Sequence, residues 1–194
     1  MAPRGVATPN VRERLFTAAE RVVGRDGPGA LTSRAVTTEA GCAKGLLHTH
    51  FAGLDEFVAE LCLDRLARTA AKARELSGLV GRNTVEENLG TVVFVMFDSG
   101  GPALASLAMV RPAAAQRFRE ALAAGAPGFT AIEGAVVRYL DEERELGRVP
   151  QRLHPHTAAL AVVGAAHHLL MTAWPGSPDP RPRMERLVAE LMKG

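Results

Sequence analysis

One short stretch, residues 31–51, holds the residues whose types and spacing are best suited to binding chemistry. If its second half is helical, Leu47 and Phe51 lie on one face, and that face is apolar. The opposite face then presents Lys44, Gly45, His48 and Thr49. An ammonium group reaches a phosphate, a glycine permits close approach, and short polar side chains meet base edges or the sugar–phosphate backbone. These residues therefore indicate a surface for nucleic acid.

Two short helices joined by a tight turn would position that surface. Thr32 or Ser33 supplies a hydroxyl that caps the first helix. Val36 and Ala40 follow at helical spacing, and Gly41 has the position of a left-handed helix stop. This arrangement predicts a helix-turn-helix, whose second helix enters the DNA major groove.

The same residues carry a resemblance to a known family. In order, the chain has Thr32, Val36, Ala40-Gly41, Cys42, Ala43-Lys44-Gly45, His48, Thr49 and His50-Phe51. This pattern resembles the DNA-binding domain of the TetR family of bacterial transcriptional regulators. The resemblance implies double-stranded operator DNA as a partner. The expected DNA-contacting residues are Thr32, Ser33, Arg34, Lys44, Gly45, His48 and Thr49.

Three positions depart from the family pattern. Ala43 stands where a serine often caps the third helix, and His48 replaces the usual tyrosine that touches the DNA backbone. Leu54 replaces a lysine that commonly reaches a phosphate. These departures keep an alternative open, in which the protein is a regulator-like dimer that binds a ligand or a protein and has weak or lost DNA binding.

Charge and composition fit a globular protein with a mildly basic N-terminal part. The 194 residues carry a formal charge of +2 and are 47% hydrophobic. Residues 1–54 hold seven Lys and Arg against four Asp and Glu, which gives +3 and leaves the remainder near −1. The two cysteines, far apart, argue against a disulfide scaffold, and no apolar signal region opens the chain. We therefore expect a cytoplasmic protein.

Hydrophobic periodicity predicts an all-α protein of about nine helices. The first helix is expected to start at Asn10, and a long connecting helix at Leu54. Later helices are expected over about 84–98, 103–124 (bent near Pro112), 129–146, 156–174 and 183–193. The predicted domains are a three-helix DNA-binding head over residues 1–53 and a larger ligand-binding and dimerisation body over residues 54–194.

The last two expected helices favour self-association. Residues 158–166 are all small or apolar, and the histidines that follow argue against a membrane span. The last helix has an apolar stripe of Met184, Leu187, Val188, Leu191 and Met192. We therefore predict a homodimer through helices about 156–174 and 183–193, paired as a four-helix bundle as in the family.

The resemblance also implies an apolar ligand pocket in the body. Its expected wall is Phe94, Phe97, Met109, Phe118, Phe129, Tyr139, His168 and Met171. No glycine-rich phosphate loop, GxSxG or HExxH motif occurs, so neither an enzyme nor a cofactor is expected. His48-x-His50 and His154-x-His156 lack a known ligand pattern, so no metal site is expected. The predicted function is a repressor released from its operator by an unidentified small apolar molecule.

Overall fold

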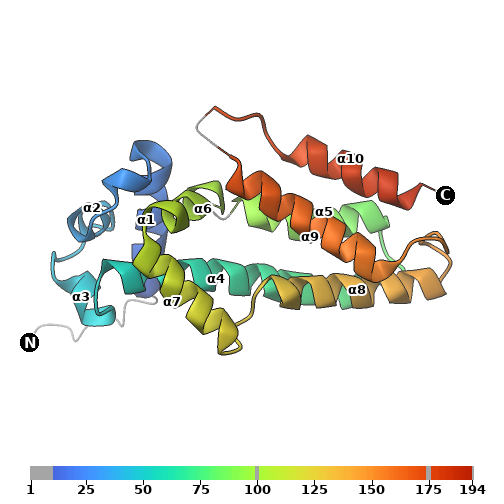
Figure 1. Cartoon of the computed structure of the whole chain (residues 1–194), viewed down its shortest axis with the longest axis horizontal. Coiled ribbons are helices and arrows are strands. Elements are labelled where there is room, and N and C mark those ends of the chain that lie inside the picture. Colours follow the sequence, from blue (N-terminus) through green and yellow to red (C-terminus); the bar gives the residue numbers. More distant parts are fainter. Residues whose placement is uncertain (1–10, 99–100, 174–175, 194) are drawn as a thin grey trace, which may run out of the picture.

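The computed structural model describes residues 11–98, 101–173 and 176–193. Over this part of the chain it contains ten α-helices and no strand, which confirms the all-α prediction (Figure 1). Two 3-10 turns, η1 (Pro28–Ala30) and η2 (Glu75–Leu79), follow α1 and α4. The helices are α1 (Val11–Asp26), α2 (Ser33–Glu39), α3 (Leu46–His50), α4 (Leu54–Arg74), α5 (Val85–Asp98), α6 (Gly101–Val110), α7 (Pro112–Ala123), α8 (Phe129–Glu145), α9 (Pro155–Met171) and α10 (Arg181–Met192).

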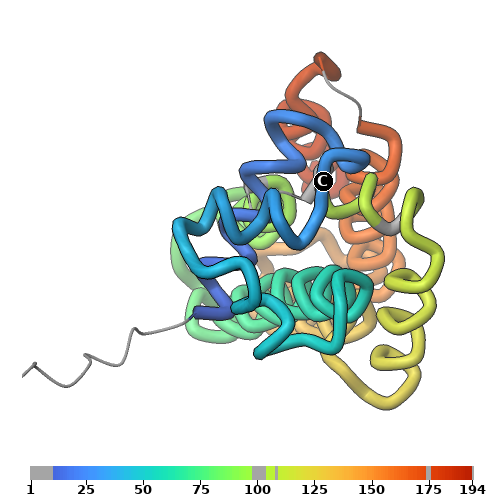
Figure 2. The backbone as a smooth tube through the Cα atoms, turned by 90° about the vertical axis from the view of Figure 1, so that its left-hand side faces the viewer, coloured from blue at the N-terminus to red at the C-terminus, as the bar shows by residue number. Residues whose placement is uncertain are grey.

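Helices α1 to α3 form a head at one end of the molecule (Figures 1 and 2). The apolar stripe of α1 is buried, with Leu15 and Ala19 fully enclosed. Three aromatic rings lock the head together: the ring centroid of Phe51 lies 5.9 Å from that of Phe16 and 5.0 Å from that of Phe57. The predicted helix start at Asn10 lies outside the described residues.

Helix α4 belongs to both halves of the molecule. Its first turns bury Phe57 and Leu61 in the apolar core of the head. Further along, Leu66, Ala70 and Ala73 are buried in the core of the body. Its 21 residues span about 31 Å at 1.5 Å per residue. This single helix therefore connects the two cores, as expected.

A capping box marks the next helix boundary, at Thr84. The backbone N–H of Glu87 donates to the hydroxyl of Thr84 over 3.1 Å, and the N–H of Thr84 donates to the Glu87 carboxylate over 2.9 Å. Reciprocal bonds of this kind satisfy two amides that a helix start leaves without partners. They fix the beginning of α5.

The helix expected over 103–124 is two separate helices. Arg111 has φ −129° and ψ 79°, so the backbone leaves the helical region immediately before Pro112 and α7 begins anew there. The guanidinium of Arg111 pairs with Asp55 in the first turn of α4 over 2.7 Å. The expected count of about nine helices is therefore one short.

Helix α6 packs against the head as well as the body. It contacts α1 and η1 on one side, and α5 and α9 on the other. Leu104 and Leu107 are buried with the residues of the head. The apolar core of the head thus draws on residues far beyond position 53, where the predicted boundary lies.

The apolar stripe of α10 does not face outwards. Met184 and Val188 are buried in the body core, and Leu187, Leu191 and Met192 pack partly buried against it. Helices α5 and α9 cover this stripe within the same chain. This stripe is therefore covered within the chain, and dimerisation through α9 and α10 stays a prediction. The outer face of α9 does remain open, with Leu160 60% exposed.

Candidate DNA-binding head and ligand cavity

The backbone of residues 32–50 has the predicted helix-turn-helix form. The Thr32 hydroxyl accepts a hydrogen bond from the N–H of Ala35 over 3.0 Å and caps α2. Gly41 has φ +61°, the left-handed conformation that favours glycine. The N–H of Cys42 then donates to the carbonyl of Thr37 over 3.0 Å, which closes the turn.

Helix α3 is shorter than expected and begins after Lys44. Residues 43–45 form a turn, and only Leu46–His50 are helical. Leu47 and Phe51 are buried, at 0% and 2% exposure. Their burial turns the other side outwards, and the exposed residues are Lys44, Gly45, His48 and Thr49. The head therefore presents these four predicted residues together at its surface.

The predicted DNA-contacting residues at the start of α2 differ in their exposure to solvent. Arg34 is exposed, and Ser33 is partly buried in the first turn. Thr32 is exposed, although its hydroxyl already serves as the helix cap. One carboxylate lies on this helix, that of Glu39, and it pairs with Arg25 over 2.9 Å. The fixed charges left open on this surface are therefore those of Arg34 and Lys44.

Side chains from α1 hold the helix-turn-helix in place. The guanidinium of Arg14 donates to the carbonyl of Ala40 over 2.9 Å, at the end of α2. The guanidinium of Arg12 lies 4.6 Å from the ring centroid of Phe51 and pairs with Glu60 on α4 over 2.8 Å. These contacts fix the exposed face relative to α1 and α4.

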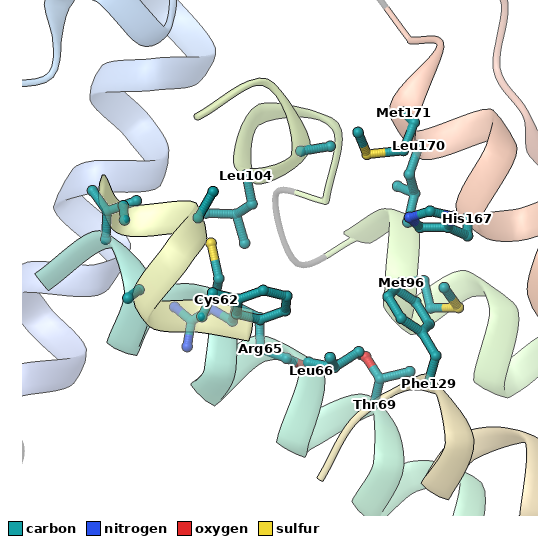
Figure 3. Close-up of a pocket in the computed structure, with 16 residues that line it drawn as sticks. Cys62, Arg65, Leu66, Thr69, Met96, Leu104, Phe129, His167, Leu170 and Met171 are labelled. Carbon is teal, nitrogen blue, oxygen red and sulfur yellow. The ribbon is translucent and has the colours of Figure 1, made fainter. Parts of the chain in front are cut away.

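A cavity of about 150 Å³ lies between α4 and the helices above it. Figure 3 shows side chains from α4, α5, α6, α8 and α9 converging on this space. Its wall is almost entirely apolar. The lining residues are Val58, Ala59, Cys62, Arg65, Leu66, Thr69, Met96, Leu104, Ala105, Ala114, Ala115, Phe118, Phe129, His167, Leu170 and Met171.

Three of the eight predicted pocket residues line this cavity: Phe118, Phe129 and Met171. The other five lie elsewhere. Phe97 is buried in the body core, and Phe94 lies beside α10 with the guanidinium of Arg181 6.0 Å from its ring centroid. Met109 is 68% exposed on α6.

Tyr139 and His168 also lie away from the cavity. The Tyr139 hydroxyl accepts a hydrogen bond from the Asn88 amide over 2.8 Å inside the body. His168 is exposed, and its neighbour His167 lines the cavity instead, with its ring centroid 4.8 Å from that of Phe129. Adjacent helical residues point about 100° apart, so only one of the two histidines faces this space.

Sequence reasoning missed the α4 side of the wall. Residues 58, 59, 62, 65, 66 and 69 share one face of that helix, at spacings of three and four. Cys62 is one of them, and burial raises the pKa of its thiol to about 12. The thiol is therefore protonated at neutral pH and acts as a small apolar wall group.

The charged side chain that lines the cavity, Arg65, is already hydrogen-bonded to carboxylates of the same chain. Arg65 is 7% exposed, and its guanidinium holds both carboxylate oxygens of Glu20, at 2.7 and 2.9 Å. It also donates to Glu13 over 3.1 Å and to Asp64 over 2.7 Å. Arg68 pairs with Glu13 and Asp64 at the edge of the same cluster. We call these five residues the Arg65 clamp, and it joins α4 to α1.

The clamp changes the titration of one of its members. Burial, the largest single influence, raises the pKa of Glu13. Hydrogen bonds and charges from Arg65 and Arg68 outweigh that influence and hold the pKa below its usual value. Glu13 is therefore ionised at neutral pH and attracts both guanidinium groups.

The described residues contain neither a cluster of metal ligands nor a membrane-spanning helix. No group of three or more His, Cys, Asp or Glu side chains there is placed to hold a metal ion. None of the helices in those ranges combines the length and hydrophobicity that crossing a membrane requires.

The head is similar to a known protein family. Residues 15–61 match the family model of bacterial regulatory proteins, tetR family. This segment contains the turn at Gly41 and the exposed face from Lys44 to Thr49. No curated protein matches the chain.

Solved structures of similar fold cover nearly the whole chain. A protein from Mesorhizobium loti assigned as a TetR-family transcriptional regulator is 15% identical, with a TM-score of 0.68 over 97% of this chain and 96% of its own. The fatty acid degradation regulator FadR from Bacillus halodurans is 20% identical, with a TM-score of 0.66 over 100% and 98%. FadR from Bacillus subtilis, solved with stearoyl-CoA, is 17% identical, with a TM-score of 0.63 over 94% and 98%. The head of this chain, over residues 15–61, is therefore similar to the tetR family of bacterial regulatory proteins, and the chain has the fold of the solved TetR-family regulators.

Proposed function

We propose that the protein is a homodimeric repressor of transcription that a small apolar molecule releases from its operator in the bacterial cytoplasm. The observation that carries this proposal is the exposed face of the head, from Lys44 to Thr49, inside the segment that matches the family. Two such heads in a dimer would enter successive major grooves about 34 Å apart. No catalytic role is proposed.

The contacts of this face with DNA follow from its chemistry. The Lys44 ammonium is exposed in the turn before α3 and reaches a phosphate. Gly45 has nothing within 4 Å of a Cβ built on it, so the backbone there is open for a close approach of the duplex. His48 and Thr49 lie one turn further along the same exposed side. Arg34, Thr32 and Ser33 are assigned to the neighbouring backbone.

Dimerisation is assigned to α9 and α10, with the outer face of α9 as the apolar contact. This face holds Leu160, which is 60% exposed, and Met171, which is 38% exposed. Gly164 lies between them with nothing within 4 Å of its Cβ position, so a second helix has room to approach. Large exposed apolar side chains on one helix face favour a subunit contact.

Ligand response is assigned to the cavity because its wall touches the head by two routes. Arg65 on α4 holds Glu13 and Glu20 of α1. Leu104 on α6 lines the cavity and packs in the core of the head. A ligand that changes the packing of α4 and α6 would therefore change the placement of the head. A coupling free energy of about 1–3 kcal/mol shifts operator affinity about 5- to 150-fold.

The decisive experiment is a gel shift with the promoter DNA of the protein's own gene, followed over a range of salt concentrations. Lys44→Ala should weaken binding to all sequences and reduce the slope of log K against log salt by about 0.9, because one phosphate contact is lost. Lys72→Ala is the matched control, since Lys72 pairs with Glu75 at the far end of α4. An unchanged slope for Lys44→Ala would contradict its phosphate role.

The same experiment decides between the repressor and the alternative. Ala43 and His48 are both exposed on the head, and Leu54 is partly buried against its core. These residues are the basis for a regulator-like ligand- or protein-binding dimer. No shift at low salt would favour that alternative and contradict the proposed repressor.

A further inference from the structure

We propose that the cavity takes a compact, uncharged apolar molecule of about one substituted aromatic ring, and not an amphiphile with an anionic head group. This inference rests on the proposed function, because it specifies the chemical class of the regulatory ligand. It follows from three properties of the cavity: its volume, the groups on its wall, and the charge beside it.

The volume of the cavity sets the size of the ligand. It measures about 150 Å³. An engineered apolar cavity of about 150 Å³ in another protein stays dry and binds benzene. Drug-sized ligands occupy pockets of about 300–1,000 Å³. A single ring with a short substituent therefore fits, whereas a long acyl chain does not.

The wall favours an aromatic guest. Phe118 and Phe129 bring ring surfaces from two different helices, and Met96 and Met171 bring sulfur atoms. Edge contacts between aromatic rings, and between thioethers and rings, are favourable beyond simple burial of area. The remaining wall is mostly alanine, leucine and valine. A flat apolar ring would meet suitable partners on several sides.

The charge beside the cavity excludes an anionic head group. Arg65 is the one described lining residue with a fixed charge, and four hydrogen bonds already bind its guanidinium to carboxylates. The clamp contains three carboxylates and two guanidinium groups, so its formal charge is −1. A ligand carboxylate would be desolvated next to this negative cluster without a counter-ion, which is costly.

Besides Arg65, the polar side chains of Thr69 and His167 lie on the wall. The Thr69 hydroxyl donates to the carbonyl of Arg65 over 3.1 Å, so its proton is already used. The imidazole of His167 is exposed at the mouth of the cavity, beside Met171 (Figure 3). One neutral substituent directed at the mouth would therefore find a hydrogen-bonding partner in His167.

The test uses the full-length dimer and three probes: toluene, benzoate and stearoyl-CoA. Toluene should raise the unfolding temperature in a concentration-dependent manner, because it binds the folded state alone. Benzoate, which has the same ring and a charge, and stearoyl-CoA should leave the unfolding temperature unchanged.

A variant that fills the cavity tests whether toluene binds there. Ala115 lines the cavity from α7, and Ala113 is exposed on the same helix. Ala115→Leu should weaken toluene binding by about tenfold or more, because the added side chain occupies the space. Ala113→Leu should leave binding unchanged. If Ala115→Leu fails to fold, Ala105→Leu on α6 fills the cavity from another side and should have the same effect.

Several outcomes would overturn the inference. Among them are no shift with saturating toluene, an equal shift in Ala115→Leu, and a shift with benzoate or stearoyl-CoA that toluene competes away. A gel shift on the same sample separates the two proposals. Operator binding without toluene binding overturns the inference alone. Toluene binding that leaves operator affinity unchanged supports the ligand class and contradicts the ligand response.

Discussion

Two glycines of the head, Gly41 and Gly45, have different roles, as their backbone angles show. Gly41 has φ +61°, and a side chain there strains the backbone. Gly45 has φ −83°, an ordinary value, and a Cβ there meets nothing within 4 Å. The first glycine is required by the fold of the head, whereas the second leaves open space towards the proposed DNA.

We predict that alanine reduces stability at position 41 and operator binding at position 45. Gly41→Ala should lower the free energy of unfolding by about 1–2 kcal/mol, the cost of a left-handed residue that has a Cβ. Gly45→Ala should change it by less than about 0.5 kcal/mol, as expected at an exposed site, but should weaken operator binding. Urea unfolding and gel shifts on both variants measure the two effects. Normal operator binding by Gly45→Ala would contradict the close approach at that position.

Which head residues face outwards could be predicted from the sequence, because a few local signals agree. The hydroxyl cap, the glycine turn and the alternation of Leu47 and Phe51 with polar residues lie within about twenty positions. Only the start of α3 was misplaced, since residues 43–45 form a turn rather than helix. Local hydrogen bonds and short-range burial decide such features, and both can be followed in the sequence.

At the scale of helices, the Arg65 clamp is the strongest polar link between α1 and α4. The side chains of Glu13, Glu20 and Asp64 are 17–35% exposed, whereas the side chain of Arg65 is almost fully buried. Because the pKa of Glu13 is lowered in the folded protein, its ionised form stabilises the fold. That contribution is complete above the pKa of an unfolded glutamate, ~4.3. It disappears as the pH falls through the lower pKa of the folded state.

This linkage makes the effect of Glu13→Gln depend on pH. At pH 7 the variant should be less stable than the wild type by about 1 kcal/mol, the upper range for a partly exposed ion pair. As the pH falls below ~4.3, the wild type should lose this advantage and the difference should shrink. Urea unfolding at several pH values measures it. Glu142→Gln, on an exposed position of α8, is the control and should show no such change.

Helix packing is where sequence reasoning reached its limit. The stripe of α10 was correctly seen as apolar, but periodicity does not say whether the same chain or a second copy covers it. The cavity wall combines residues from six helices, and its α4 face has the pattern of any buried stripe. Nothing in such a pattern distinguishes a face packed against side chains from one that borders empty space. The break at Pro112 was expected as a bend because proline permits either result.

For the whole molecule, two exposed leucines test the proposed dimerisation through α9. Leu160 lies on the outer face of α9 and is 60% exposed, and Leu146 follows α8 and is 57% exposed. Leu160→Arg should give a monomer of 20.6 kDa by light scattering and should weaken operator binding about 100-fold or more, because two linked heads become one. Leu146→Arg should remain a dimer with normal operator binding. A dimeric Leu160→Arg would place the interface elsewhere.

The double role of α6 and α7 constrains how this protein can change over time. Leu104 and Ala114 border the cavity and are also part of the apolar packing of the head. In the proposed repressor, a mutation there that adapts the protein to a new compound would also change its affinity for the chromosome. Ligand recognition and promoter recognition could not evolve independently in such an architecture. Lineages that acquire a new inducer through these positions should therefore carry compensating changes in the head, and an engineered biosensor would need selection for both properties at once.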